Sequence, residues 1–159
     1  MIKMEIKGLL MDPVSNMPVV ILRDTEKGHF LPIWVGIFEA NAIALEMEKV
    51  STPRPMTHDL LKNLLGELDA RVDRIVINDL RENTFFARIH LTRGDSTLSV
   101  DSRPSDAIAL ALRSKAEIFV EEEVLEKSRS LRSDSDQDPD RLKKWLEEAS
   151  PDELGKYRM

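Results

Sequence analysis

The chain has 159 residues, a formal net charge of −6 and no cysteine. Its length suits one domain with a short appendage, and 42% hydrophobic with 33% charged residues is typical of a soluble globular protein. The absence of cysteine excludes a disulfide framework, a thiolate zinc site and a cysteine nucleophile. The longest uncharged apolar run, residues 30–38, falls short of the roughly 18 residues of a membrane span. The N-terminus shows no signal-peptide pattern, so we expect a cytoplasmic protein.

Hydrophobic periodicity in the first half predicts three strands followed by two helices. We expect the strands at residues 2–12, 18–24 and 29–35, and the helices at 38–49 and 57–69. The second helix carries a leucine stripe that we expect to face the core, with Thr57 as its cap: Leu60, Leu61, Leu64, Leu65 and Leu68.

The second half repeats this pattern. We expect strands at 72–80, 85–92 and 96–101, a helix at 104–113, a short strand at 118–120 and a turn of helix at 121–127. The centre of the helix, residues 107–112, is apolar all round, which predicts burial on more than one side.

An internal repeat links the two halves. Ala-Ile-Ala-Leu at 42–45 recurs at 107–110, and the flanking hydrophobic pattern follows at the same spacing. The sequence therefore predicts an α+β fold of two β-β-β-α-α units, residues 2–69 and 72–127, with helices packed on mixed or antiparallel sheets.

The body is expected to end near residue 127. Residues 128–138 are rich in Ser and Asp, a composition typical of linkers. In the tail, residues 139–159, helical spacing brings Leu142, Trp145, Leu146 and Ala149 to one face. We expect an amphipathic helix there that packs on the body or binds a partner chain.

Two Arg-Pro pairs, at 54–55 and 103–104, each precede a helix with acidic residues in its first turn. Helix N-termini attract anions such as phosphate, and the planar guanidinium groups of Arg54 and Arg103 would add phosphate contacts. Ser105 would contribute a hydroxyl at the second site.

The residues beside these arginines offer acid–base and metal chemistry. Asp101 and Asp106 could hold a divalent metal ion such as Mg²⁺, and His58 could carry a proton. Glu39 opens the first helix at a position that the repeat relates to the second Arg-Pro site. The alternative is purely structural. The acidic first-turn residues would complement the helix dipoles, and the side chains of Thr57 and Ser105 would cap the N-termini of their helices.

Charge and missing motifs narrow the function classes. Lysines and arginines are scattered along an acidic chain, which disfavours tight non-specific binding to duplex DNA. The chain has no dinucleotide-binding glycine motif, phosphate-binding loop, serine-hydrolase elbow or zincin motif. The scatter is still compatible with a small local basic patch that the fold assembles from distant arginines.

Three segments carry a family resemblance. They are Leu-Pro-Ile-Trp-Val-Gly at 31–36 with Phe-Glu-Ala at 38–40, Arg-Pro-Met-Thr-His-Asp-Leu-Leu at 54–61, and Arg-Pro-Ser-Asp-Ala-Ile-Ala-Leu-Ala at 103–111. In this order they resemble the bifunctional nuclease family of bacteria and plants, over about residues 1–127. The tail from residue 138 also resembles bacterial members.

The resemblance implies a duplicated fold, a homodimer and cleavage of both DNA and RNA. One hypothesis is therefore a metal-assisted nuclease acting on single-stranded or structured nucleic acid. In it Asp101, Asp106 and Glu39 are candidate ligands or catalytic groups, with His58 as the acid or base. The other is a non-enzymatic, dimeric interaction or small-anion-binding module that uses the Arg-Pro helix starts. No membrane partner is expected.

Overall fold

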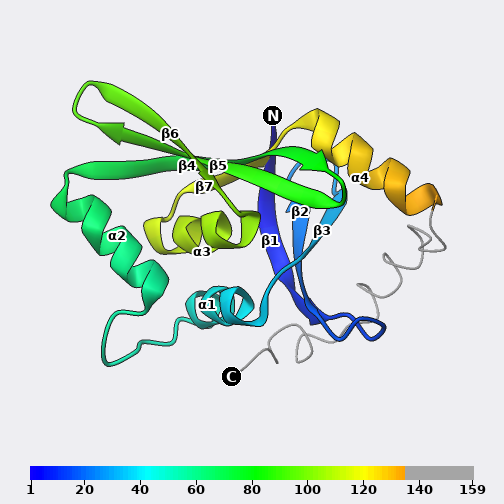
Figure 1. The fold of residues 1–159 in the computed structure, drawn as a ribbon, viewed down its shortest axis with the longest axis horizontal. Coiled ribbons are helices and arrows are strands. Elements are labelled where there is room, and N and C mark those ends of the chain that lie inside the picture. The colour runs from blue at the N-terminus through cyan, green and yellow to red at the C-terminus, as the bar shows by residue number, and fades with distance from the viewer. Residues whose placement is uncertain (135–159) are drawn as a thin grey trace.

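The computed structural model describes residues 1–134 and shows an α+β fold, as the sequence predicts. Its strands form one seven-stranded mixed sheet in the order β3-β2-β1-β7-β4-β5-β6 (Figure 1). Only the pairing of β4 with β7 is parallel, and all other neighbours are antiparallel. No helix of the described residues is long and apolar enough to cross a membrane.

Two antiparallel meanders form the two sides of the sheet. The first consists of β1 (Ile2–Met11), β2 (Pro18–Asp24) and β3 (Phe30–Trp34), and the second of β4 (Ala70–Arg81), β5 (Thr84–Arg93) and β6 (Ser96–Ser102). The turn between β2 and β3 needs Gly28, whose φ of 73° is the left-handed conformation that glycine adopts without a steric cost. β7 (Glu117–Val120) lies between the meanders and joins β1 to β4.

Three helices lie on the same side of the sheet in Figure 1: α1 (Ile37–Met47), α2 (Thr57–Glu67) and α3 (Pro104–Ser114). α3 contacts both α1 and α2, as well as β4 and β5. Its central residues, 107–111, are all buried, which confirms the expectation from its apolar sequence. The core is one aliphatic cluster of strand and helix side chains, among them Leu22, Ile43, Ile75, Ile77 and Ile108.

The leucine stripe of α2 differs from the prediction. His58 is the only buried residue of this helix, and Leu60, Leu61, Leu64 and Leu68 are about half exposed. The inward-facing expectation is confirmed for Leu65, which packs against the core. It was wrong for the other four because α2 lies at the end of the sheet and contacts α3 and the start of β4 on one side only. Helical periodicity identifies an apolar face but not what covers it.

The last described helix, α4 (Glu122–Asp134), is longer than the expected turn at 121–127. Residues 128–134, read as the start of a linker, therefore continue the helix. Buried Val124 and Leu125 attach α4 to the core, and from there the helix propagates into the polar segment. The rest of the expected linker and the expected tail helix lie outside the described residues.

The arrangement of the meanders and helices agrees only in part with the predicted internal repeat. Both meanders run outward from the centre of the sheet, and α1 and α3, which carry the repeated Ala-Ile-Ala-Leu, pack against each other. After α3, however, the chain forms strand β7 where the first unit has helix α2. A duplication as the origin of the two halves stays a prediction.

Candidate functional site

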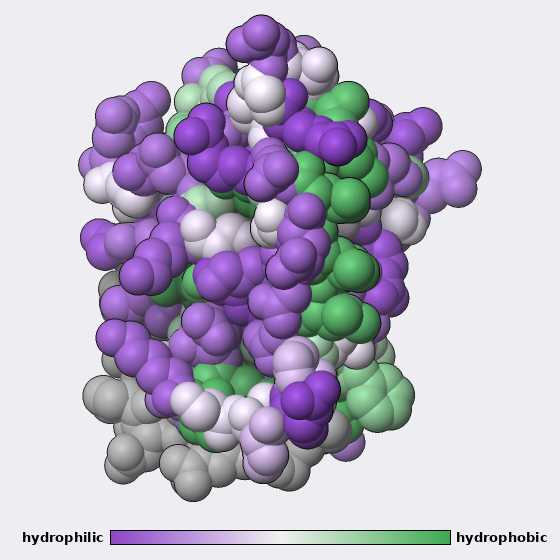
Figure 2. Space-filling model, turned by 90° about the vertical axis from the view of Figure 1, so that its left-hand side faces the viewer, coloured by the Kyte–Doolittle hydropathy of each residue, from purple (hydrophilic) through white to green (hydrophobic). Residues whose placement is uncertain are grey.

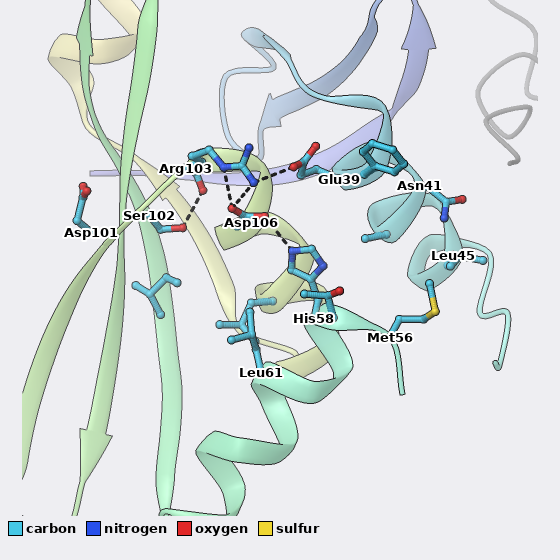
Figure 3. A pocket seen from close by; sticks show the side chains of 15 residues that line it. Glu39, Asn41, Leu45, Met56, His58, Leu61, Asp101, Ser102, Arg103 and Asp106 are labelled. Atoms are coloured by element: carbon cyan, nitrogen blue, oxygen red, sulfur yellow. Dashed lines mark hydrogen bonds and ion pairs between the residues drawn. The ribbon is translucent and has the colours of Figure 1, made fainter. Parts of the chain in front are cut away.

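A cavity of about 750 Å³ lies where α1, α2, α3 and the end of β6 meet (Figure 3). Five of the predicted site residues line it. Asp101 comes from β6, and the other four come from three different helix starts: Glu39, His58, Arg103 and Asp106. The remaining wall is mostly apolar and includes Phe38, Leu45, Leu61, Ile89 and Leu110.

His58 and Asp106 form a pair that joins α2 to α3. Nε2 of His58 lies 2.9 Å from Oδ1 of Asp106, and the His58 side chain is only 9% exposed. An ionised Asp106 accepts a hydrogen bond from the Nε2–H of His58, and in that tautomer Nδ1 is the nitrogen with a free lone pair. The expected cap at Thr57 is wrong: the helix begins at Thr57, and Asp59 caps it by accepting a hydrogen bond from the Met56 N–H.

Arg103 connects this pair to α1. Its Nε and Nη2 contact Oδ2 of Asp106 at 2.9 and 2.8 Å, and Nη2 contacts Oε1 of Glu39 at 2.7 Å. The hydrogen bonds with Asp106, and then with Glu39, raise the pKa of the Arg103 guanidinium. The side chain is 66% exposed, and its Nη1 has no partner within residues 1–134. This nitrogen can therefore bind an incoming anion.

The Arg103 backbone, rather than a side-chain cap, begins α3. Arg103 is the N-cap residue, Pro104 follows in the first turn, and no side chain caps this end. The capping expectation for Ser105 is therefore wrong. Proline lacks an N–H and needs no partner at the first position, and Ser105 is instead buried in the helix.

The absence of a side chain at Gly36 leaves space for the Glu39 carboxylate. A Cβ at position 36 would overlap Oε2 of Glu39, so any larger residue would displace the carboxylate that pairs with Arg103. The Glu39 side chain is only 15% exposed. The sequence places Gly36 just before the helix, but nothing in the pattern indicates this close approach.

The structure does not bring the other predicted site residues into this cluster. Asp101 borders the cavity, but its carboxylate points away from Arg103 and Asp106 (Figure 3), and the strand register places it opposite Arg88. Arg54 lines a separate hollow of about 340 Å³ formed by the loop before α2. Asp101 and Asp106, the two expected metal ligands, therefore do not come together, and Arg103 pairs with Asp106 alone.

The predicted divalent metal ion fits these residues poorly. Both oxygens of Asp106 are engaged, one by His58 and one by Arg103, and Asp101 is turned away. Residues 1–134 contain no group of three His, Asp or Glu side chains that could hold a metal ion. An ion bound by Asp106 would first have to displace an existing partner.

Arg113, a buried arginine outside the set of predicted site residues, holds together the helices that carry the site. Arg113 is 6% exposed, and its Nε donates to Oδ1 of Asp59 at 2.7 Å. Its Nη1 and Nη2 donate to the carbonyl oxygens of Ala109 and Ala42 at 2.9 and 3.0 Å. This one side chain therefore ties α1 and α2 to α3. An arginine directly after the apolar run 107–112 of α3 was the available signal.

The Asp59 carboxylate predicts a loss of stability in acid. Burial raises its pKa, but the hydrogen bonds from the Met56 N–H and from Arg113 lower it more, so the net pKa is below the ordinary value. A pKa lowered in the fold stabilises the protein above the unfolded-state pKa of about 3.9, and this contribution is lost as pH falls through the folded value. We expect the free energy of unfolding to fall below about pH 4. Asp59→Asn should flatten this decline in urea titrations at several pH values, and an equal slope in both proteins would contradict the assignment.

The amino-acid sequence matches a known protein family. The model of the bifunctional nuclease domain matches residues 20–132. An uncharacterized protein of Mycobacterium tuberculosis (strain ATCC 25618 / H37Rv) is 37% identical over 162 residues, covering 96% of this chain and 97% of that protein.

Plant relatives match over the body. Bifunctional nuclease 2 of Arabidopsis thaliana is 28% identical over 116 residues, and Bifunctional nuclease 1 of Oryza sativa subsp. japonica is 25% identical over 114. These alignments cover 71% and 70% of this chain, but only 35% and 34% of the plant proteins. Since the domain model covers most of the described residues and the mycobacterial relative aligns along nearly the whole chain, this chain belongs to the bifunctional nuclease domain family.

Proposed function

We propose that this protein hydrolyses phosphodiester bonds of single-stranded DNA and RNA in the cavity between α1, α2 and α3. The observation that carries the proposal is the His58–Asp106 pair beside the exposed guanidinium of Arg103, in one cavity of a bifunctional nuclease domain. The names of the plant relatives support the reaction class. The three segments that bear the family resemblance supply Glu39, His58, Arg103 and Asp106.

The roles follow from the contacts. Nη1 of Arg103 binds a non-bridging phosphate oxygen and stabilises the charge that develops on it. Nδ1 of His58, with Nε2 held by Asp106, accepts the proton of a water molecule that attacks phosphorus. The bond from phosphorus to the leaving oxygen breaks as the new bond forms, and the leaving oxygen takes a proton from a solvent water molecule. Glu39 and Asp106 hold the guanidinium in place on two sides.

The alternative is a module that binds a small anion without cleaving it. The observation in its favour is that both carboxylates of the cluster are already paired with Arg103 or His58. In that case the exposed Nη1 and the start of α3 would bind a phosphate or carboxylate group. Binding without cleavage is the outcome that distinguishes this alternative.

A cleavage assay on single-stranded RNA and DNA tests the proposal. We expect both substrates to be cut, and we expect Arg103→Gln to lower kcat/KM by at least tenfold, about 1.4 kcal/mol of transition-state binding. Arg54→Gln removes the same charge in the separate hollow and should stay within twofold of wild type. Parallel reactions with a chelator and with added Mg²⁺ test the metal-assisted form. Binding of labelled single strands without any product, in all of these reactions, would reject the nuclease in favour of the anion-binding module.

Two further proposals concern the assembly and the location of the protein. We propose a homodimer, because a large apolar area of the described surface has no cover within residues 1–134. The cytoplasmic location stays a proposal that rests on the sequence pattern alone, and fractionation of cells that express the tagged chain would test it.

A further inference from the structure

Helix α2 exposes the side chains that its sequence marks as apolar. Leu60, Leu61, Leu64 and Leu68 are exposed by 50, 41, 51 and 54%, and their spacing places them on one face of the helix. Exposed leucines normally occur singly on a monomer, whereas a continuous row marks an interaction surface.

Strand β6 provides a second apolar row next to this one. It is the edge strand of the sheet, and every residue of it except Ser102 is exposed. Leu98 and Val100 pair with Leu91 and Ile89 of β5, so both point to the side of the sheet that carries α2 and α3. Figure 2 shows apolar side chains gathered in one column along this end of the molecule.

We name these six residues the α2–β6 face: Leu60, Leu61, Leu64, Leu68, Leu98 and Val100. The face adjoins the candidate site, because Leu61 of α2 and Ser102 of β6 both line the 750 Å³ cavity. Within residues 1–134 no element covers it, since each of the six side chains is at least 41% exposed.

The backbone of β6 indicates what kind of partner fits. An edge strand offers a row of unpaired N–H and C=O groups, and proteins usually protect such an edge with lysine, proline or a bulge. β6 has no lysine or proline, its pairing with β5 is regular, and its only charge is Asp101. At Ser99 the hydroxyl and the carbonyl oxygen accept hydrogen bonds from Arg88 of β5, at 2.6 and 2.8 Å. No strand of the described residues pairs with the outer edge of β6, which is therefore open to a further antiparallel strand.

We infer that a second copy of this chain covers the α2–β6 face, with β6 pairing antiparallel to the β6 of the partner about a twofold axis at Ser99. This inference rests on the homodimer proposed above and names its interface. In this register Leu98 lies opposite the partner's Val100, on the side of α2. Thr97 lies opposite the partner's Asp101, and no two like charges meet. The strand can therefore pair with a second copy of itself without bringing like charges together.

The proposed pairing also affects the cavity that holds the candidate site. In the proposed dimer both α2 helices lie on the same side of the joined sheet, so the two leucine rows flank the paired β6 strands. The two cavities then lie on either side of the axis, each bordered by Leu61 and Ser102 of the interface elements. The partner closes the end of the cavity between α2 and β6.

A single cysteine tests the register. The chain has no cysteine of its own, so Ser99→Cys introduces the only thiol. Directly opposed residues of an antiparallel pair have Cα atoms about 4.5 or 5.5 Å apart, which a disulfide spans. We expect mild oxidation to convert most of this variant to a covalent dimer on non-reducing gels. Ser51→Cys, in an exposed loop, is the control and should stay monomeric on the gel.

Failure of Ser99→Cys to cross-link, or equal cross-linking of the loop control, would overturn the register. Sedimentation without any substrate then tests the face. We expect wild type and Asn63→Asp to be dimers at tens of micromolar, and Leu64→Asp to be monomeric but folded by circular dichroism. Asn63 is the neighbouring exposed position off the leucine row, and its substitution adds the same charge.

Two outcomes of sedimentation would overturn the inferred interface. A monomeric wild type would mean that another part of the chain or another protein occupies the face, and a dimeric Leu64→Asp would place the interface elsewhere. Neither result depends on cleavage, so an inactive dimer would reject only the proposed nuclease, and an active monomer would reject only the interface.

Discussion

Asp106→Asn is expected to lower the cleavage of single-stranded nucleic acid by at least a hundredfold, about 2.7 kcal/mol of barrier. Asp106 orients His58 through one oxygen and pairs with Arg103 through the other. An asparagine keeps the shape of the side chain but cannot hold both partners as a charged acceptor, because one of its two positions is a donor. The measurement is kcat/KM on a labelled single strand, with Tm recorded in parallel.

Asp101→Asn is the matched comparison. Asp101 has the same residue type and also borders the cavity, but its carboxylate points away from the cluster. We expect its kcat/KM to fall by less than tenfold. Equal losses in the two variants would show that the cleavage chemistry does not depend on the His58–Asp106–Arg103 arrangement. A loss of cleavage that only follows the loss of folded protein would give Asp106 a structural role.

Replacement of Arg113 by methionine should have the largest effect on stability. The substitution keeps an apolar stem but removes hydrogen bonds to Asp59 and to two main-chain carbonyls, in a residue that is 6% exposed. Since Asp59 retains some contact with solvent, we expect a loss of about 2–3 kcal/mol in the free energy of unfolding. This corresponds to a Tm lower by roughly 10 °C.

Thermal and urea unfolding of Arg113→Met measure this loss. Arg71→Met is the control, because Arg71 also pairs with an aspartate but is 76% exposed, and its Tm should barely change. An Arg113→Met protein that melts with the wild type would contradict the role of this side chain in joining the three helices. Cleavage at a temperature where the variant is folded should also fall, because Asp59 lies next to His58 in the first turn of α2 and its ion pair with Arg113 attaches that turn to α3.

Most elements of the fold could be predicted from the sequence because their signals are local. Alternation in β5 and the apolar run in α3 depend on neighbouring residues, and the observed elements agree with the expected ones. What packs against the apolar face of a helix or strand, in contrast, is not determined by neighbouring residues in the sequence. The same spacing of leucines in α2 would suit a helix in the core and a helix at an interface, and only the place of α2 at the end of the sheet distinguishes the two.

The site shows the same limit. The residue types and the helix starts indicated Glu39, His58, Arg103 and Asp106, and the structure brings all four to one cavity. Asp101 was expected to join them because it is close in sequence. The direction of its side chain depends on the β5–β6 register, in which it lies opposite Arg88. Arg113 was missed because its partners Ala42 and Asp59 are distant in sequence and give no pattern.

The position of β7 bears on how the chain folds during synthesis. β1 is made first and β4 much later, yet the two meet only through β7, which comes from residues 117–120. Until the ribosome has released these residues, the two meanders are separate sheets, each with an open inner edge that can bind another nascent chain. The four side chains of the site come from α1, α2 and α3, so they come together only after α3, residues 104–114, has also been released. Completion of the sheet and assembly of the site are therefore late, coupled events in the life of this chain.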